Sequence, residues 1–113
     1  MSRHDERNAI RHMIDHAREA VSLAAGRTPE QIESDRVVHL ALARLFEIVG
    51  EAATRVSEET RARHPEVSWV EAIAMRNRLI HGYDSVDLAV VLDAVRLDLP
   101  DFIRKLEAVL EKP

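Results

Sequence analysis

The sequence predicts an all-α protein, and more specifically an antiparallel bundle of four long helices. Apolar residues recur at the helical spacing i, i+3, i+4 and i+7 along most of the chain. Only three glycines and four prolines interrupt the 113 residues, so the uninterrupted stretches are long enough for helices of several turns. Short connections between such helices favour antiparallel neighbours. We expect residues 1–113 to form one domain, because a chain of this length buries roughly two-thirds of its unfolded surface.

Composition excludes several classes of protein. The chain has no cysteine, which excludes disulfide frameworks, thiolate nucleophiles, cysteine-based zinc sites and iron–sulfur clusters. No apolar run approaches the ~20 residues needed to cross a bilayer, and the charged residues 1–7 do not resemble a signal peptide. We therefore expect a cytoplasmic protein with no membrane partner. The formal net charge of −4 does not itself predict a nucleic-acid partner, so RNA would have to be bound by a local group of arginines.

The first helix is expected over residues 2–25. Its apolar residues form one stripe at helical spacing: Ile10, Met13, Ile14, Ala17, Val21 and Ala24. Gly26 stands where a glycine commonly ends a helix. The run Thr28-Pro29-Glu30-Gln31 then predicts a new, short helix, with threonine as N-cap, proline in the first turn and glutamine reaching back to the cap.

The second long helix is expected to start near Ser34 or Asp35. Eight residues predict a broad apolar face on it: Val37, Val38, Ala41, Leu45, Ile48, Val49, Ala52 and Val56. Residues 57–64 are polar, and we expect them to continue this helix as an extension. Pro65 should end it, because the residue before a proline avoids the helical conformation.

The third and fourth helices are separated by a glycine. The run Ser68-Trp69-Val70-Glu71 fits a capping box and predicts the start of the third helix, which is expected to end about two residues before Gly82. The fourth helix should begin after residue 84 or 85 and extend to about Glu111. Pro100 should kink or split it, because proline lacks a backbone donor and its ring clashes with the preceding turn.

The third helix carries an arginine where the spacing predicts an apolar residue. At roughly 100° per residue, Trp69, Ile73 and Ile80 fall within about 40° of one another and predict the buried centre of the helix. Arg76 projects within roughly 20° of Trp69. An unpaired guanidinium in a dry core costs several kcal/mol. Arg76 must therefore be paired or face a solvent-filled groove.

Other polar residues follow Arg76 closely. Asn77 lies on the flank of the apolar face, whereas Arg78 lies on the opposite side, where a solvated surface charge is the better interpretation. His81 lies roughly 140° from Arg76 around an ideal helix, so the two side chains converge only if the helix loosens at its end or if two copies face each other. Taken alone, His81 is explained equally well by an interaction with the helix dipole. Tyr83 would return towards the Arg76 side if the turn continued.

The pattern Arg76-x4-His81-x-Tyr83 resembles the signature of the HepT-like branch of the HEPN superfamily, and the likeness extends over roughly residues 35–103. It also includes Ala41-Leu42, Ile48-Val49-Gly50-Glu51-Ala52, Pro65 to Ser68-Trp69, Asn77, Ile80 and Gly82. Members of this branch are toxins usually encoded beside a minimal nucleotidyltransferase antitoxin. The resemblance therefore implies a HEPN-like bundle, a toxin of a type VII-like toxin–antitoxin system, and a metal-independent endoribonuclease that needs no cofactor.

The residue types suit cleavage of RNA, which carries its own nucleophile in the 2′-hydroxyl. His81 supplies an imidazole, which ordinarily titrates close to pH 6.5 and can move protons. Arg76 supplies a fixed cation whose paired donors match phosphate oxygens. Asn77 would orient the phosphate or the arginine. The expected products are a 2′,3′-cyclic phosphate and a 5′-hydroxyl.

The resemblance also implies how the chain assembles and is controlled. Members of the family work as homodimers in which both signatures line a shared cleft, and this would give Arg76 a wet groove and double the local arginines. The tyrosine matching Tyr83 receives AMP from the partner nucleotidyltransferase, which silences the toxin. Arg44, Glu51 and Arg55 are candidates for lining the same cleft, although a row of surface ion pairs is the better interpretation.

Two other interpretations stay open. A non-catalytic HEPN module, serving as a scaffold for a nucleotidyltransferase or nucleotides, would not need both Arg76 and His81. A plain four-helix dimerisation domain would leave the placement of Arg76 unexplained.

His12 and His16 lie four residues apart without a suitably spaced acidic ligand, so a solvated face is favoured over a metal site. Trp69 is interpreted as a core anchor and not as a platform for stacking bases.

Overall fold

Helices make up most of the part of the chain that the structure describes. The computed structural model describes residues 2–82 and 88–112, and within these ranges the side chains of all residues except 81, 82, 88, 89 and 92. The elements are α1 (Arg3–Ala24), α2 (Pro29–Ser34), α3 (Arg36–Thr54), α4 (Glu58–Arg63), α5 (Trp69–Gly82), α6 (Leu88–Asp93), a π-helical segment (Ala94–Asp98) and α7 (Leu99–Glu111). These ranges contain no strand, and none of their helices is long and apolar enough to span a membrane. The predicted all-α fold is confirmed.

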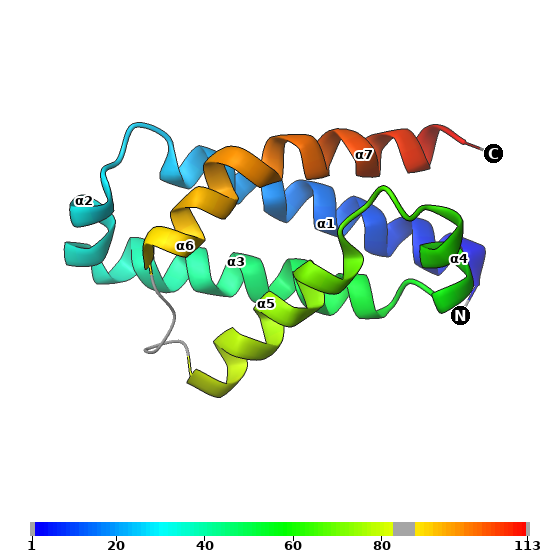
Figure 1. Ribbon diagram of the computed structural model, residues 1–113, viewed down its shortest axis with the longest axis horizontal. Coiled ribbons are helices and arrows are strands. Elements are labelled where there is room, and N and C mark those ends of the chain that lie inside the picture. Colours follow the sequence, from blue (N-terminus) through cyan, green and yellow to red (C-terminus); the bar gives the residue numbers. More distant parts are fainter. Residues whose placement is uncertain (1, 83–87, 113) are drawn as a thin grey trace.

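The long helical segments form the predicted antiparallel bundle (Figure 1). Helices α1 and α3 lie side by side and run in opposite directions, and α7 lies along α1. Helix α5 packs mainly against α3 and leans away from α6 and α7. The molecule measures 44 × 28 × 19 Å, and its shortest dimension corresponds to about two helix diameters. Helix α5 therefore has one helical neighbour along most of its length.

Local capping sets the helix boundaries much as the sequence predicts. Ser2 caps α1, and the helix is followed by Gly26 at a φ of 73°, a left-handed conformation that glycine adopts without strain. Thr28 and Gln31 form the expected capping box at the start of α2. Asp35 caps α3 by accepting a hydrogen bond from the backbone of the first turn. Each of these predicted boundaries is confirmed, because each depends on residues that are close in sequence.

The buried face of α3 differs from the predicted one. Val37 is 76% exposed, and Ala41 and Ile48 are only half-buried. Leu42 and Phe46, which were not predicted to face inwards, are buried instead. The remaining predicted residues are buried: Val38, Leu45, Val49, Ala52 and Val56. Helix α3 packs against α1 on one side and α5 on the other, so its buried sector is rotated towards the space between those two helices.

The prediction that residues 57–64 extend the second long helix is wrong. Helix α3 ends at Thr54, and Ser57 caps the separate helix α4. A carboxylate from α1 makes this break favourable: Glu6 Oε1 accepts a hydrogen bond from the Ser57 backbone N–H at 2.6 Å, and Glu6 Oε2 accepts one from Thr60 Oγ1 at 2.8 Å. The start of α4 is thereby tied to α1. The end of α4 two residues before Pro65 agrees with the prediction.

Pro100 divides the last helical segment, as expected. The helix widens into a π turn over Ala94–Asp98, in which the backbone N–H of Leu99 donates to the carbonyl of Ala94. Pro100 then occupies the first turn of α7, where its missing N–H costs little. The wider turn accommodates a residue that cannot continue an ordinary α-helix.

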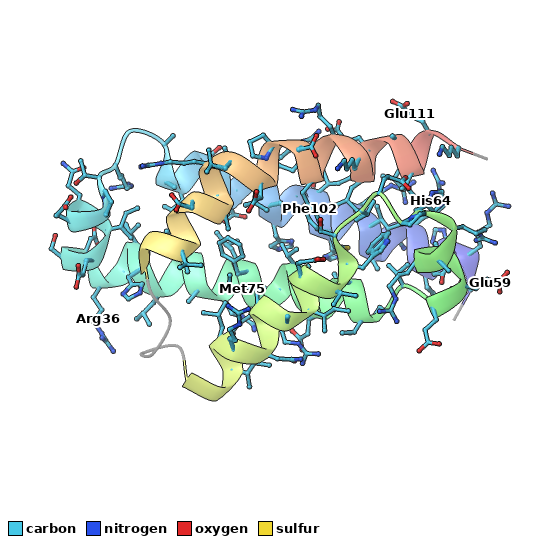
Figure 2. All side chains as sticks on the ribbon, in the orientation of Figure 1. Arg36, Glu59, His64, Met75, Phe102 and Glu111 are labelled. Carbon is cyan, nitrogen blue, oxygen red and sulfur yellow. The ribbon has the colours of Figure 1, made fainter. Side chains whose placement is uncertain are left out.

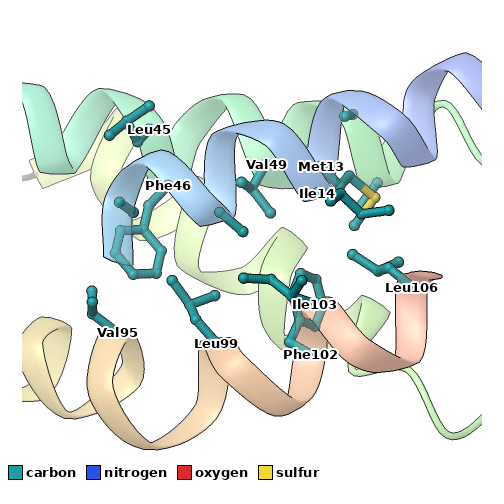
Figure 3. Packing of buried hydrophobic residues seen from close by; sticks show 14 of the residues in the cluster. Met13, Ile14, Leu45, Phe46, Val49, Val95, Leu99, Phe102, Ile103 and Leu106 are labelled. Atoms are coloured by element: carbon teal, nitrogen blue, oxygen red, sulfur yellow. The ribbon is translucent and has the colours of Figure 1, made fainter. Parts of the chain in front are cut away.

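The apolar core lies between α1, α3 and α7 (Figure 3). Its most deeply buried side chains include Met13 of α1, Leu42 of α3 and Leu106 of α7. Val21 is the one residue of the predicted α1 stripe that is only partly buried, and it packs against the edge of this core. Because the core is built largely without α5, one side of α5 is available for polar groups.

Candidate functional site

The backbones of α3 and α5 approach closely where the two helices cross. Gly50 is buried on α3, and a Cβ atom placed on it would lie 2.3 Å from Arg76 Cβ and 2.7 Å from the carbonyl oxygen of Ala72. Both distances are far shorter than ordinary van der Waals contact. Only glycine fits at this position without moving α5. The crossing therefore places Arg76 directly against α3.

Arg76 is half-buried, with its side-chain stem against α3. Its Nε is buried and has no hydrogen-bond partner among the residues that the structure describes. Helix α3 carries two carboxylates, Glu47 and Glu51, and Arg44 Nη1 lies 3.4 Å from the first and 4.0 Å from the second. Arg76 was expected to be paired or to face a solvent-filled groove. The described residues give its Nε no partner and cover it, while the residue as a whole is only half-buried, so neither expectation is met in full by this part of the chain.

The buried face of α5 is rotated from the predicted one. Trp69 is buried as predicted, and its indole Nε1 donates to the carbonyl of His64 at 2.9 Å, so it is a core anchor. Ile73 is only partly buried, and Ile80 is 51% exposed. Leu79 is buried in its place. Helical spacing predicted the stripe of Trp69, Ile73 and Ile80 as the buried centre, whereas the side of α5 that is buried is the one that meets its main helical neighbour, α3.

The residues next to Arg76 are placed on two sides of α5. Asn77 and Arg78 are both exposed, as expected for Arg78. Helix α5 remains α-helical through residues 81 and 82, so positions 76 and 81 lie roughly 140° apart around its axis. The His81 side chain and all of Tyr83 lie outside the described residues. Within one chain the helical backbone of α5 therefore does not bring positions 76 and 81 to the same side, and a facing of two copies stays a prediction.

The predicted row on α3 lies at the surface. Arg44, Glu51 and Arg55 are all exposed. Arg44 pairs with Glu51 within its own helix, which agrees with the interpretation of this row as surface ion pairs. Such pairs contribute little to stability. Their place in a cleft between two chains stays a prediction.

A groove of about 680 Å³ separates α5 from α6 and α7, and sequence reasoning did not predict it. Met75 of α5 and Phe102 of α7 border it (Figure 2). Exposed apolar residues line it at Val70 and Leu97, each 72% exposed. Four carboxylates and two cations also line it: Glu71, Asp93, Asp98, Asp101, Arg78 and Lys105. The excess of carboxylates makes this groove unsuitable for RNA phosphates, and it does not include Arg76.

The described residues offer no cluster for a metal ion. No group of three or more histidine or acidic side chains in the described part of the chain is arranged to hold one. His12 and His16 stack with ring centroids 5.8 Å apart, and a ring nitrogen of His16 lies 2.7 Å from the carbonyl of His12. This local arrangement accounts for the pair without a ligand.

The comparison with protein families decides which family this is. The family model described as "Ribonuclease HepT-like" matches residues 10–109. The chain belongs to this family. The match confirms the resemblance seen in the sequence, and it covers α3, α5 and the Arg76-x4-His81-x-Tyr83 pattern.

Relatives of this HepT-like chain come from bacteria and archaea. A protein of Thermococcus cleftensis, named "Probable ribonuclease HepT", is 36% identical over 78 residues, which cover 69% of the chain and 71% of that protein. A provisionally named RNase of Caldanaerobacter subterraneus subsp. tengcongensis is 27% identical over 103 residues, covering 91% and 92%. A provisionally named RNase of Methanocaldococcus jannaschii is 26% identical over 109 residues, covering 96% and 100%. No solved structure matches.

Proposed function

We propose that this HepT-like chain is a metal-independent endoribonuclease whose catalytic residues are Arg76 and His81, with Asn77 as an auxiliary residue. The observation that carries the proposal is the placement of Arg76 and the lack of a hydrogen-bond acceptor for its Nε. Its stem is fixed against Gly50, its Nε is covered and lacks an acceptor in the described part of the chain, and the carboxylates of α3, Glu47 and Glu51, pair with Arg44. An arginine with a purely structural role would be expected to pair with such a carboxylate. A phosphate oxygen would supply the missing acceptor.

The proposed reaction is an internal transfer of the phosphoryl group. The 2′-hydroxyl oxygen attacks the adjacent phosphorus, and the bond from phosphorus to the 5′-oxygen breaks. A neutral imidazole accepts the proton of the 2′-hydroxyl, and an imidazolium donates a proton to the departing 5′-oxygen. Arg76 stabilises the charge that develops on the non-bridging oxygens, and Asn77 is positioned to orient the phosphate. The products are a 2′,3′-cyclic phosphate and a 5′-hydroxyl.

The same proposal includes a homodimer. Positions 76 and 81 diverge around α5, so one copy is poorly arranged to bring both groups to one phosphate, whereas two facing copies can do so. A dimer would also bring two Arg76 side chains to the RNA, although the chain has a net charge of −4. Exposed apolar side chains on α3 and α5, at Val37, Leu40 and Ile80, are of the kind that such an interface would cover.

The catalytic assignment is tested by incubating purified protein with total RNA in the presence of EDTA and mapping the ends of the fragments. Arg76→Ala and His81→Ala should each reduce cleavage by roughly 100-fold or more, in line with the loss of one such group from an active site. Arg78→Ala is the matched control. Arg78 is an exposed arginine on the same helix, and it lines the groove between α5 and helices α6 and α7, which does not include Arg76. Wild-type cleavage by Arg76→Ala or His81→Ala would show the assignment to be wrong, and intact RNA with every protein would favour a non-catalytic scaffold.

Mixing the two inactive variants tests the shared site. If each site takes Arg76 from one chain and His81 from the other, a heterodimer of Arg76→Ala and His81→Ala contains one intact site of two. Half of the randomly paired dimers are of this kind, so the mixture should recover about a quarter of wild-type activity. The mixture is first left until the subunits have exchanged, and light scattering confirms that it is dimeric. If it is then fully inactive, each site lies within one chain.

We further propose that the chain is a toxin whose partner is a minimal nucleotidyltransferase that transfers AMP to Tyr83. A phosphate attached close to Arg76 would compete with RNA phosphate for the same guanidinium. Tyr83→Phe should remain ribonucleolytic and should escape inactivation when incubated with the partner enzyme and ATP. Equal inactivation of Tyr83→Phe and wild-type protein would contradict covalent control at this residue.

A further inference from the structure

The contact between Gly50 and Arg76 couples the packing of two helices to the placement of one side chain. A Cβ atom on Gly50 would lie 2.3 Å from Arg76 Cβ, 3.0 Å from Arg76 Cγ and 2.7 Å from the carbonyl oxygen of Ala72. Two of these three neighbours belong to the stem of Arg76. The surface of α3 at Gly50 is therefore the surface on which the arginine stem rests, and it restricts the directions that the stem can take.

The backbone contact prevents an easy adjustment around a larger residue. The carbonyl oxygen of Ala72 belongs to α5 itself, so it cannot rotate away as the end of a flexible side chain would. Relieving a 2.3 Å contact to ordinary van der Waals distance requires α5 to move outwards by roughly 1 Å or more. Such a movement would displace Arg76 together with the helix. Gly26 lacks this property, because nothing lies within 4 Å of a Cβ placed there.

We propose that Gly50 is a positioning residue that sets where the Arg76 guanidinium stands relative to the RNA phosphate. This inference rests on the proposed ribonuclease function. Gly50 touches no substrate, and it acts by allowing α5 to approach α3. A misplacement of about 1 Å in a catalytic group can reduce the rate by roughly 100-fold. Gly50→Ala should therefore reduce RNA cleavage by about 10- to 100-fold while the protein stays helical.

A double-mutant cycle separates this role from a general effect on folding. Gly50→Ala is made in three backgrounds: wild type, Arg76→Ala and Arg78→Ala. Alanine at position 76 keeps the Cβ, so the closest contact, and with it the loss of thermal stability, should be similar in all three. The readouts are the single-turnover cleavage rate, the Kd for a 2′-O-methyl RNA that cannot be cleaved, and the thermal unfolding midpoint.

The expected result is a loss of activity that depends on Arg76. Gly50→Ala should lower the rate by about 10- to 100-fold in the wild-type and Arg78→Ala backgrounds, and by less than about 2-fold once Arg76 is replaced. Where the Arg76→Ala rate is too low to measure, the Kd for the 2′-O-methyl RNA should show the same dependence on Arg76. An equal loss in all three backgrounds, or wild-type activity of Gly50→Ala, would overturn the role of Gly50.

Two further outcomes remain informative. If Gly50→Ala does not fold, the pair Gly50→Ala and Arg76→Gly, which removes two of the three close contacts and leaves the 2.7 Å contact with the Ala72 carbonyl oxygen, should recover part of the helical circular dichroism signal. Failure of that pair to fold would show that the glycine is needed irrespective of Arg76, and it would overturn the proposal. If the wild-type chain cleaves no RNA, the proposed function itself is overturned. This outcome is distinguishable from the one in which the wild-type chain cleaves RNA and Gly50→Ala cleaves it equally well.

Discussion

Glu6 holds together the part of the fold from which α5 starts, and replacing it with glutamine tests this role. Its carboxylate accepts hydrogen bonds from the Ser57 backbone N–H at 2.6 Å and from Thr60 Oγ1 at 2.8 Å. Thr60 is buried, with an exposed fraction of 6%. Helix α4 is followed by His64, whose carbonyl receives the indole hydrogen bond of Trp69 at the start of α5. Glu6 thus connects α1 to the chain segment that leads to the candidate site.

The stability effect of Glu6→Gln follows from these two hydrogen bonds. A hydrogen bond to a charged group contributes about 1.5–3 kcal/mol, and a neutral one about 1 kcal/mol. Glutamine keeps one carbonyl acceptor and loses the charge, which on these values removes about 2–5 kcal/mol. Because Glu6 is only partly buried and solvent screens its charge, the free energy of unfolding should fall by about 1–2 kcal/mol at pH 7. For a chain of 113 residues, each 1 kcal/mol corresponds to about 4 °C in Tm. The expected decrease in Tm is therefore about 4–8 °C.

The effect should depend on pH in a defined direction. Partial burial acts to raise the pKa of the Glu6 carboxyl, but hydrogen bonds from Ser57 and Thr60 and the charge of Arg63 outweigh it and hold the pKa below its ordinary value. A carboxyl whose pKa is lowered by folding stabilises the protein above its unfolded pKa of about 4.3. That contribution is lost as the pH falls through the folded-state pKa. The difference between wild type and Glu6→Gln should be complete at pH 7 and should shrink below about pH 4.5.

Urea denaturation followed by circular dichroism at pH 7 and at pH 3 measures this difference. Glu19→Gln is the matched control, because Glu19 is an exposed glutamate on the same helix. It should change the free energy of unfolding by less than about 0.5 kcal/mol at either pH. A gap between wild type and Glu6→Gln that is equally large at pH 3, or a Glu19→Gln effect of the same size, would refute the reasoning.

Three further predictions concern other parts of the fold. Trp69→Phe should lower the free energy of unfolding by about 2 kcal/mol in urea denaturation, because it removes the indole hydrogen bond to the His64 carbonyl and leaves space at a buried position; an unchanged midpoint would contradict this. Gly26→Ala should cost about 1 kcal/mol by the same assay, since φ at this position is 73°, and a gain in stability would show that the turn relaxes. Arg44→Ala should change stability by less than about 1 kcal/mol, because the Arg44 side chain that pairs with Glu47 and Glu51 is 62% exposed, and a tenfold loss of RNA cleavage by this variant would place the α3 row in the cleft.

The helix boundaries were predictable because their causes are local. Ser2, Thr28 and Asp35 accept hydrogen bonds within the first turn of the helix that follows them, so a few neighbouring residues are enough to identify each start. Pro100 divides the last helix through its own covalent structure. The break before α4 was missed even though Ser57 caps α4 locally, because the sequence reasoning placed the end of one continuous helix at Pro65. Glu6 of another helix also helps to stabilise the break, and sequence spacing contains no sign of that contact.

The buried faces were only partly predictable because burial depends on which helices meet. Ile80 and Val37 continue the apolar periodicity of α5 and α3, yet both are exposed. Helical spacing gives the angle between side chains but not the direction in which the neighbouring helix lies. The role of Gly50 was hidden for the same reason: a glycine within an apolar helix suggests close packing, but the residue that packs there is on another helix.

Arg76 differs from these cases, because its departure from the pattern was visible in the sequence and persists in the fold. Arg76 is half-buried against α3, and its covered Nε–H donates to no described residue. Arg78, two positions later, is exposed to solvent, so α5 can carry an arginine without such a cost. On the proposed function, an RNA phosphate completes the hydrogen bonding of a guanidinium that the fold places against Gly50 and leaves without an acceptor for Nε among the described residues.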